Sequence, residues 1–170
     1  IDLTLIPEDF LPRTNFQVAV DPARQARPSV RWNSSLRHSD LYRVGLRKML
    51  GQNGERTLSG SIIPSGLGHI NGIQSAAFES EHDLLNAHAL WVSIPYDFLV
   101  KATNRQNLYE PDLGAMPWVV PIQTAVHRGL RLACLTNFYR DLWNCNVGRL
   151  SVLPWSSPDP RLRLEGPVEG

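Results

Sequence analysis

Residues 61–117 read SIIPSGLGHINGIQSAAFESEHDLLNAHALWVSIPYDFLVKATNRQNLYEPDLGAMP, and the pattern of this stretch decides the predicted fold. It begins with a short run of β-type residues, passes through a glycine-rich turn into a second β-run, and then changes to helical spacing. The stretch predicts a compact frame that displays two polar loops. These loops are GLGHINGIQS (66–75) and KATNRQNLY (101–109).

Helical signals follow the second β-run. Ser80 and Asp83 have the spacing of an N-terminal helix cap, and apolar residues then recur on one helical face. Pro95 ends that helix, because proline lacks the backbone N–H and clashes with the preceding turn. We expect a second helix over residues 96–101. Further on, residues 122–143 place apolar side chains at steps of four, which predicts one long amphipathic helix.

A β-hairpin is predicted before this stretch. Residues 42–47 alternate apolar side chains with Arg43, Gly45 and Arg47, so a strand would gather the arginines on one face. Asn53-Gly54 favours a tight primed turn, which would join this strand to a partner ending at Ile63. A further strand is expected over residues 70–78.

The predicted fold class is α+β, a twisted and mainly antiparallel sheet with a helical pair and one long C-terminal helix packed on it. The predicted organisation is a domain over 1–121, a scaffold helix over 122–146 and a proline-rich tail over 147–170. A chain of 170 residues is large enough for one domain with its own core. We expect it to be a piece of a longer polypeptide, because it starts without methionine and ends in a Pro/Gly-rich string.

Cysteine content and hydropathy indicate the compartment. Cys134 and Cys145 are too few for a disulfide framework or a zinc site, so we expect reduced, buried thiols. The apolar runs are far shorter than the roughly 20 residues that a membrane span needs. A cytoplasmic protein with no membrane partner is the prediction.

The basic residues are distributed unevenly. Between Arg13 and Arg56 there are nine basic and three acidic residues, whereas residues 57–100 contain four acidic residues and no lysine or arginine. This asymmetry suggests a surface that faces a polyanion, with a solvated arginine-rich face as the alternative.

The sequence offers no catalytic, cofactor or metal site. His38-Ser39-Asp40 contains the letters of a hydrolase triad, but adjacent residues cannot align as nucleophile, base and orienting group. His82 and His88 are six residues apart, so they would point to different faces of a helix. The glycines near position 66 lack the Gly-Lys-Ser/Thr sequence of a phosphate loop.

Nucleic-acid recognition fits the loops better. Base edges are read by Arg, Lys, Asn, Gln, Ser and Thr, and phosphates bind Arg, Lys and hydroxyls. The candidates for approaching bases or sugar are His69, Asn71, Gln74, Lys101, Thr103, Asn104, Arg105, Asn107 and Tyr109. The candidates for holding phosphates are Arg43, Arg47, Lys48 and Arg56. The alternative is that polar loops are polar only because they face water.

Several motifs resemble a known family. They are RVGLR (43–47), ERTLSGSIIP (55–64), HIN (69–71), WVSIPYDF (91–98) and LRLACLTNFYRDLW (130–143). Over roughly residues 41–143 the chain is similar to the target-recognition regions of large adenine-specific DNA methyltransferases. These enzymes belong to bacterial restriction-modification and phage-defence systems, with TaqI-like specificity domains and DISARM-type methylases as examples.

The resemblance implies sequence-specific recognition of double-stranded DNA, with a target adenine positioned for a catalytic domain elsewhere in the polypeptide. Residues 1–121 would then be the target-recognition domain. The Asn/Asp-Pro-Pro-Tyr/Phe motif of such methylases is absent here. We therefore expect no enzymatic activity and no S-adenosylmethionine binding by this chain, whereas the full-length polypeptide would be an adenine-N6 DNA methyltransferase that uses this cofactor.

Two alternatives remain open. A protein-interaction module could dock subunits of a defence complex through Trp118, Trp143, Trp155 and the proline-rich tail. A small independent hydrolase is a third class, but the sequence offers no residues for it. Salt-sensitive binding to duplex DNA distinguishes recognition from docking. The recognition hypothesis also requires both polar loops and the arginine-bearing hairpin to lie on a common side.

Overall fold

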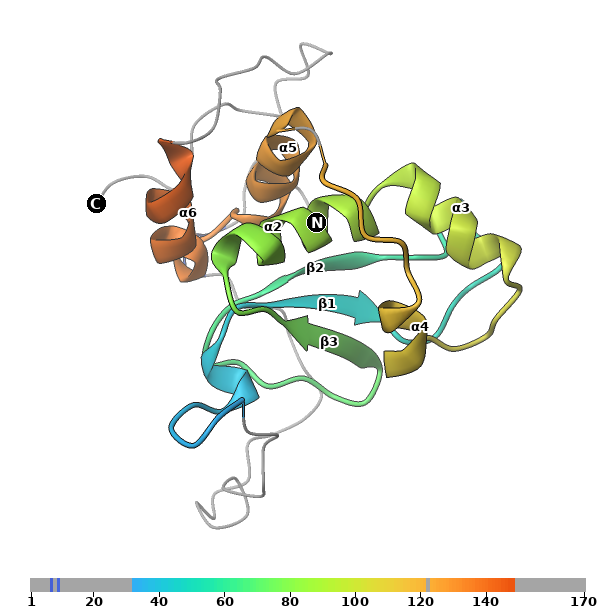
Figure 1. The fold of residues 1–170 in the computed structure, drawn as a ribbon, viewed down its shortest axis with the longest axis horizontal. Coiled ribbons are helices and arrows are strands. Elements are labelled where there is room, and N and C mark those ends of the chain that lie inside the picture. Colours follow the sequence, from blue (N-terminus) through green and yellow to red (C-terminus); the bar gives the residue numbers. More distant parts are fainter. Residues whose placement is uncertain (1–6, 8, 10–31, 122, 149–170) are drawn as a thin grey trace.

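The computed structural model describes residues 7, 9, 32–121 and 123–148, and Figure 1 shows their arrangement. Three antiparallel strands form a sheet in the order β2-β1-β3. The strands are β1 (Arg43–Arg47), β2 (Gly60–Ile63) and β3 (Ile73–Ala77). Helices pack against this sheet, so the predicted α+β class with an antiparallel sheet is confirmed.

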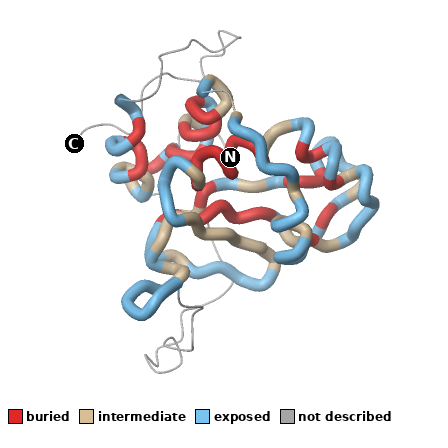
Figure 2. The backbone as a smooth tube through the Cα atoms, in the orientation of Figure 1, coloured by how far each residue is buried: buried red, intermediate tan, exposed pale blue. Residues whose placement is uncertain are grey.

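The central strand β1 is buried along most of its length (Figure 2). Val44 and Leu46 are fully buried in the hydrophobic core. Gly45 points to the opposite face, where a Cβ atom would lie 2.5 Å from Cδ1 of Ile63. A larger side chain would displace the Ile63 side chain, so the glycine leaves room for Ile63 to lie across this face of β1.

The hairpin predicted from residues 42 to 63 is present, but its turn differs from the expectation. β1 and β2 pair from Arg43↔Ile63 to Leu46↔Gly60. The connection is the whole segment 48–59, and neither Asn53 nor Gly54 has the positive φ that a primed turn requires. Tertiary contacts decide its path, because Leu50 and Leu58 in this segment are buried in the core.

Helix α2 (Glu81–Trp91) begins as the sequence predicts. The side chain of its N-cap residue, Ser80, accepts a hydrogen bond from the Asp83 N–H at 3.1 Å. All residues from 84 to 91 are buried, because α2 packs on β1 and β2 on one side and on helix α5 (Gln123–Ala133) on the other. The α2 helix is therefore the middle layer of the molecule.

Helix α3 (Ile94–Ala102) follows α2 after two residues, with Pro95 in its first turn, where a missing N–H costs nothing. A short helix that the sequence analysis did not predict, α4 (Glu110–Gly114), comes next. Its Asp112 carboxylate accepts a hydrogen bond from the Tyr109 N–H at 2.8 Å. This contact closes a capping box and starts the helix.

The single long helix expected over 122–146 is instead two helices. After α5 ends at Ala133, a short 3₁₀ segment η3 (Asn137–Tyr139) leads into α6 (Arg140–Val147). The break lets Tyr139 reach the sheet, where its hydroxyl donates to the Ile62 carbonyl at 2.8 Å, while the Tyr42 hydroxyl donates to the Phe138 carbonyl at 3.2 Å. These long-range contacts outweigh the helical periodicity of the sequence.

The expectations for the cysteines, for membrane spans and for the terminal segments are tested in part. Cys134 is buried as predicted, whereas Cys145 is exposed, and both thiols are free. Among the described helices none combines the length and the apolar character required to cross a membrane. Residues 149–170 of the tail predicted over 147–170, and the basic residues from Arg13 to Arg31, lie outside the described residues.

Candidate nucleic-acid interface

The two polar loops meet at Lys48, the residue immediately after β1. Its backbone N–H donates to the Gly72 carbonyl at 2.9 Å, and its carbonyl accepts from the Leu108 N–H at 2.8 Å. The second loop then runs beside the chain after β1, since the Leu50 N–H donates to Gln106 and Met49 forms an isolated β-bridge with Asn107. The backbone of residues 48–50 thus places both loops beside the end of β1.

The side chain of Lys48 also joins the two loops. Its Nζ donates to Oδ1 of Asn71 at 2.8 Å and lies 5.2 Å from the centroid of the Tyr109 ring. A cation over an aromatic face at an exposed site contributes about 0.5–1 kcal/mol. The ammonium group has three N–H donors and Asn71 uses one of them, so it can still bind an anion.

We call the group formed by Arg47, Lys48, Asn71, Asn107 and Tyr109 the loop junction. Arg47 is exposed at the end of β1, and Asn71 and Tyr109 are exposed on the loops. The side chains of Lys48, Asn71 and Tyr109 meet there, whereas Arg47 and Asn107 are brought to the end of the central strand by the backbone, Arg47 as its last residue and Asn107 through its bridge to Met49. Cations suit phosphates, and amides can donate to and accept from base edges.

Arg43 and Arg47 share the face of β1 opposite the core, but only Arg47 is exposed. The guanidinium of Arg43 donates to the Leu67 carbonyl and, at 3.4 Å, to the Leu41 carbonyl. The residue is 3% exposed, and this burial lowers its pKa. In this position Arg43 holds the loop after β2 against the sheet.

His69 and Gln74 do not lie together. The His69 ring bonds back onto its own loop and strand, with Nε2 2.7 Å from the Ser75 hydroxyl and Nδ1 3.0 Å from the Ile70 carbonyl. Gln74 neighbours Ser75 in β3, so its side chain points to the opposite face of the sheet. Each of them can reach a ligand only on its own face.

Three other candidates form a separate corner, where the 48–59 segment meets α3. Arg56 donates to the Val92 carbonyl at 2.8 Å, and its Nε lies 3.6 Å from Oδ2 of Asp97. The Lys101 ammonium donates to the Gly54 carbonyl at 3.1 Å, and the Thr103 hydroxyl to the Val100 carbonyl at 2.6 Å. These side chains bind protein groups and hold the corner in place.

Asn104 and Arg105 follow α3 directly. Asn104 has a φ of 51°, a left-handed conformation that asparagine tolerates and that commonly ends a helix. Arg105 forms an ion pair with Asp112, and its carbonyl accepts from Gln52 at 2.6 Å. The guanidinium is therefore directed to α4 and is paired with a carboxylate of the protein.

Two carboxylates that were not among the predicted site residues, Asp97 and Asp112, are central to this region. Oδ1 of Asp97 accepts hydrogen bonds from the Thr57 N–H at 2.8 Å and the Leu58 N–H at 2.6 Å. Because the partners are about 40 residues apart in the chain, no local pattern could reveal the contact. Asp112 did carry a signal, its capping distance of three residues from Tyr109.

His38 and the possible metal ligands are the remaining chemical groups of interest. Burial, followed by the nearby charges of Arg43 and His69, lowers the pKa of His38. In the described part of the chain, no group of three or more His, Cys, Asp or Glu side chains is placed to hold a metal ion.

Comparison of the chain with models of protein families, with curated proteins and with solved structures gave no match.

Proposed function

We propose that this chain is a DNA-recognition module and that the loop junction binds duplex DNA. The observation that carries the proposal is the hydrogen bonding of Lys48 to both polar loops, next to a second cation, Arg47. A duplex presents a regular array of phosphates beside base edges, so its reader needs cations and amides on one rigid support. The end of β1 offers such a support.

Roles within the loop junction follow from chemistry. Arg47 and Lys48 contact phosphates, because both are cationic and stand at the end of the central strand. Asn71 and Asn107 reach base edges, since an amide can pair with the donor and acceptor of adenine in the major groove. Tyr109 packs on the Lys48 ammonium and positions it.

The wider context rests on the resemblance of the sequence motifs to target-recognition regions. In that context a catalytic domain of the same polypeptide binds S-adenosylmethionine and methylates the adenine that this chain positions. Other subunits of a phage-defence system are further partners, and the setting is the bacterial cytoplasm. This chain itself supplies DNA contacts and no reacting group.

Charge removal at the loop junction tests the proposal. The double variant Arg47→Met/Lys48→Met keeps the apolar stems and removes two cations. We expect weaker binding to every duplex sequence, and a slope of log affinity against log salt that is shallower by roughly two, about one for each lost phosphate contact. Fluorescence anisotropy with labelled duplexes over a range of salt concentrations measures both quantities.

Arg128→Met is the matched control, because Arg128 is an exposed cation on α5, in the layer beyond α2. It should leave the affinity and the salt slope close to those of the unmodified chain. If Arg128→Met weakens binding as much as the double variant does, or if the chain shows no salt-sensitive DNA binding, the loop junction is not the DNA-binding face.

Protein docking is a second candidate, and exposed apolar side chains favour it. Ile94 and Phe98 on α3 are 73% and 71% exposed, and Val120 after α4 is 78% exposed. The Tyr96 hydroxyl donates to the Pro117 carbonyl and so holds the two segments together. Strongly exposed apolar side chains on two segments that are held together are candidates for a protein interface.

The docking candidate differs in part from the sequence prediction. Trp118 is half exposed and fits it, whereas Trp143 is buried in the core and cannot offer a docking surface. Trp155 lies outside the described residues. A docking module needs no salt-sensitive affinity for DNA, so the anisotropy measurement separates the two candidates.

A further inference from the structure

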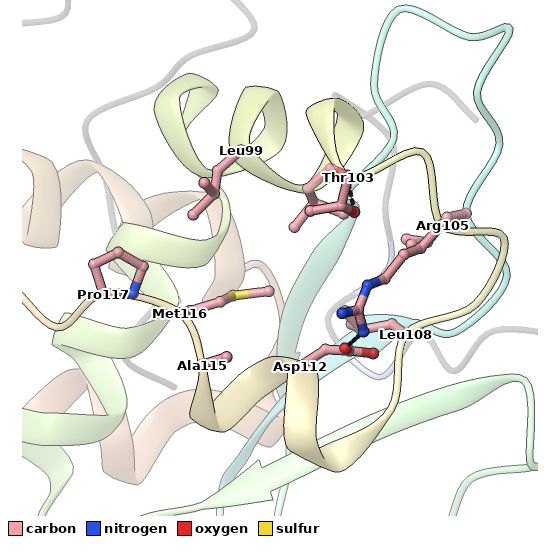
Figure 3. A pocket seen from close by; sticks show the side chains of 10 residues that line it. Leu99, Thr103, Arg105, Leu108, Asp112, Ala115, Met116 and Pro117 are labelled. Carbon is pink, nitrogen blue, oxygen red and sulfur yellow. Dashed lines mark hydrogen bonds and ion pairs between the residues drawn. The ribbon is translucent and has the colours of Figure 1, made fainter.

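A cavity of about 210 Å³ lies between α3 and α4 (Figure 3). Most of its wall is apolar and comes from four segments of the chain: the 48–59 segment, α3, the second polar loop and the chain after α4. The apolar lining residues are Leu50, Leu99, Val100, Leu108, Ala115, Met116 and Pro117. An engineered apolar cavity of about 150 Å³ is large enough for benzene, so this one has room for a six-membered ring with a substituent.

One side of the cavity is polar and consists of an ion pair. The guanidinium Nη1 of Arg105 contacts Oδ1 of Asp112, and both residues line the cavity (Figure 3). The Asp112 side chain is 10% exposed, whereas the Arg105 side chain is 55% exposed. Arg105 therefore stands at the rim, and Asp112 lies deeper in the wall.

The ion pair leaves hydrogen-bonding capacity on both partners. Asp112 uses Oδ1 for Arg105 and Oδ2 for the Tyr109 N–H, and each carboxylate oxygen can accept a second bond. Arg105 has five N–H donors in a planar fork. The third polar lining group, the Thr103 hydroxyl, is already bonded to the Val100 carbonyl.

We infer that this cavity binds a small neutral molecule that carries an apolar ring and an adjacent N–H and C=O, as in a carboxamide or a cyclic amide. The N–H donates to Asp112, the C=O accepts from Arg105, and the ring fills the apolar part. A carboxylate ligand would face the Asp112 charge, and a cationic ligand would face the Arg105 charge. The Arg105–Asp112 pair, whose charges cancel, therefore selects a neutral ligand that carries an N–H donor and a C=O acceptor side by side.

Three ring compounds of the same shape test this inference: benzamide, benzoate and benzamidinium. Titration of the full chain, followed by calorimetry or by ligand-observed NMR, gives the three affinities. We expect saturable binding of benzamide, with a dissociation constant on the order of a millimolar for so small a ligand. Benzoate and benzamidinium should bind at least about tenfold more weakly, because each brings a charge against a like charge.

Two single substitutions should reorder the series in opposite directions. Asp112→Asn leaves the Arg105 charge alone, so benzoate should become the preferred ligand. Arg105→Met leaves the Asp112 charge alone, so benzamidinium should be preferred. Ala115→Phe should abolish binding of all three compounds, because the added ring fills the cavity.

The inference is overturned if benzamide does not saturate, or if ethylbenzene binds as tightly as benzamide. It is also overturned if the order of the three affinities is the same in both charge variants, because the ion pair would then not contribute to ligand recognition. Circular dichroism of each variant checks that the overall helix content is unchanged. The cavity adjoins the loop junction, because Asp112 accepts from the Tyr109 N–H and the Leu108 N–H donates to the Lys48 carbonyl. The ring compounds are titrated in the absence of DNA, so their affinities do not depend on whether the chain binds DNA.

Discussion

His88 is a buried titratable side chain in the middle layer of the molecule. It is 3% exposed, its Nδ1 atom has no hydrogen-bond partner, and a Cβ at Gly129 of α5 would lie 3.1 Å from that atom. Desolvation lowers its pKa from 6.5 to about 4. The ring is therefore neutral in the folded protein at neutral pH, and protonation requires a charge to be buried between α2 and α5.

Stability should fall in mild acid because of this residue. The folded-state pKa lies below the unfolded value, so the unfolded chain takes up the proton first as the pH decreases. The contribution is fully present above pH 6.5 and is lost as the pH falls toward about 4. We expect the free energy of unfolding to drop by about 2 kcal/mol between roughly pH 7.5 and pH 5.

Urea denaturation at the two pH values measures this change, and His88→Gln is the control because glutamine does not titrate. The variant should lose about 2 kcal/mol less than the unmodified chain over the same interval. An identical pH dependence in both proteins would show that His88 is not the responsible group.

Among the elements, α3 carries the buried carboxylate that binds the backbone of the 48–59 segment. Asp97 is 6% exposed and accepts hydrogen bonds from two backbone N–H groups of the 48–59 segment. Replacement by alanine would leave both donors without a partner in a buried site. Each unsatisfied buried donor costs about 1–3 kcal/mol.

We expect Asp97→Ala to lower the free energy of unfolding by roughly 2–4 kcal/mol and Asp97→Asn by less, because asparagine keeps one acceptor oxygen. Asp83→Ala is the comparison, since that carboxylate is half exposed in the first turn of α2 and contributes about 0.5 kcal/mol. Chemical denaturation of the three variants gives the values. Equal losses for Asp97→Ala and Asp83→Ala would contradict the structural role of Asp97.

Local patterns predicted those elements whose signals lie within a few residues. The Ser80 cap, the break near Pro95 and the alternating strand at residues 42–47 all appear in the structure. The wrong predictions share another cause. Asn53-Gly54 does not form its preferred turn, and residues 122–143 do not form one helix, because buried contacts from distant parts of the chain decide both segments.

At the scale of the whole molecule, the sequence indicated which loops are polar but not which of their side chains meet. Lys48, Asn71 and Tyr109 come together only because β1 ends where both loops cross it. Arg43, Arg56 and Arg105 have the same chemistry in the sequence, yet their partners in the protein differ. Arg43 binds two carbonyls, Arg56 binds a carbonyl and a carboxylate, and Arg105 binds a carboxylate. These arginines differ in their partners in the folded structure, and the spacing of residues in the sequence does not encode those partners.

The most direct measurement for the proposed function is an NMR titration of the ¹⁵N-labelled chain with a short DNA duplex. Binding at the loop junction predicts that the largest shift changes fall on Arg47, Lys48 and residues 70–72 and 106–109, and that these changes diminish as salt is added. Changes confined to α5 and α6 or to the apolar surface around Phe98 and Val120, or no changes at all, would contradict it.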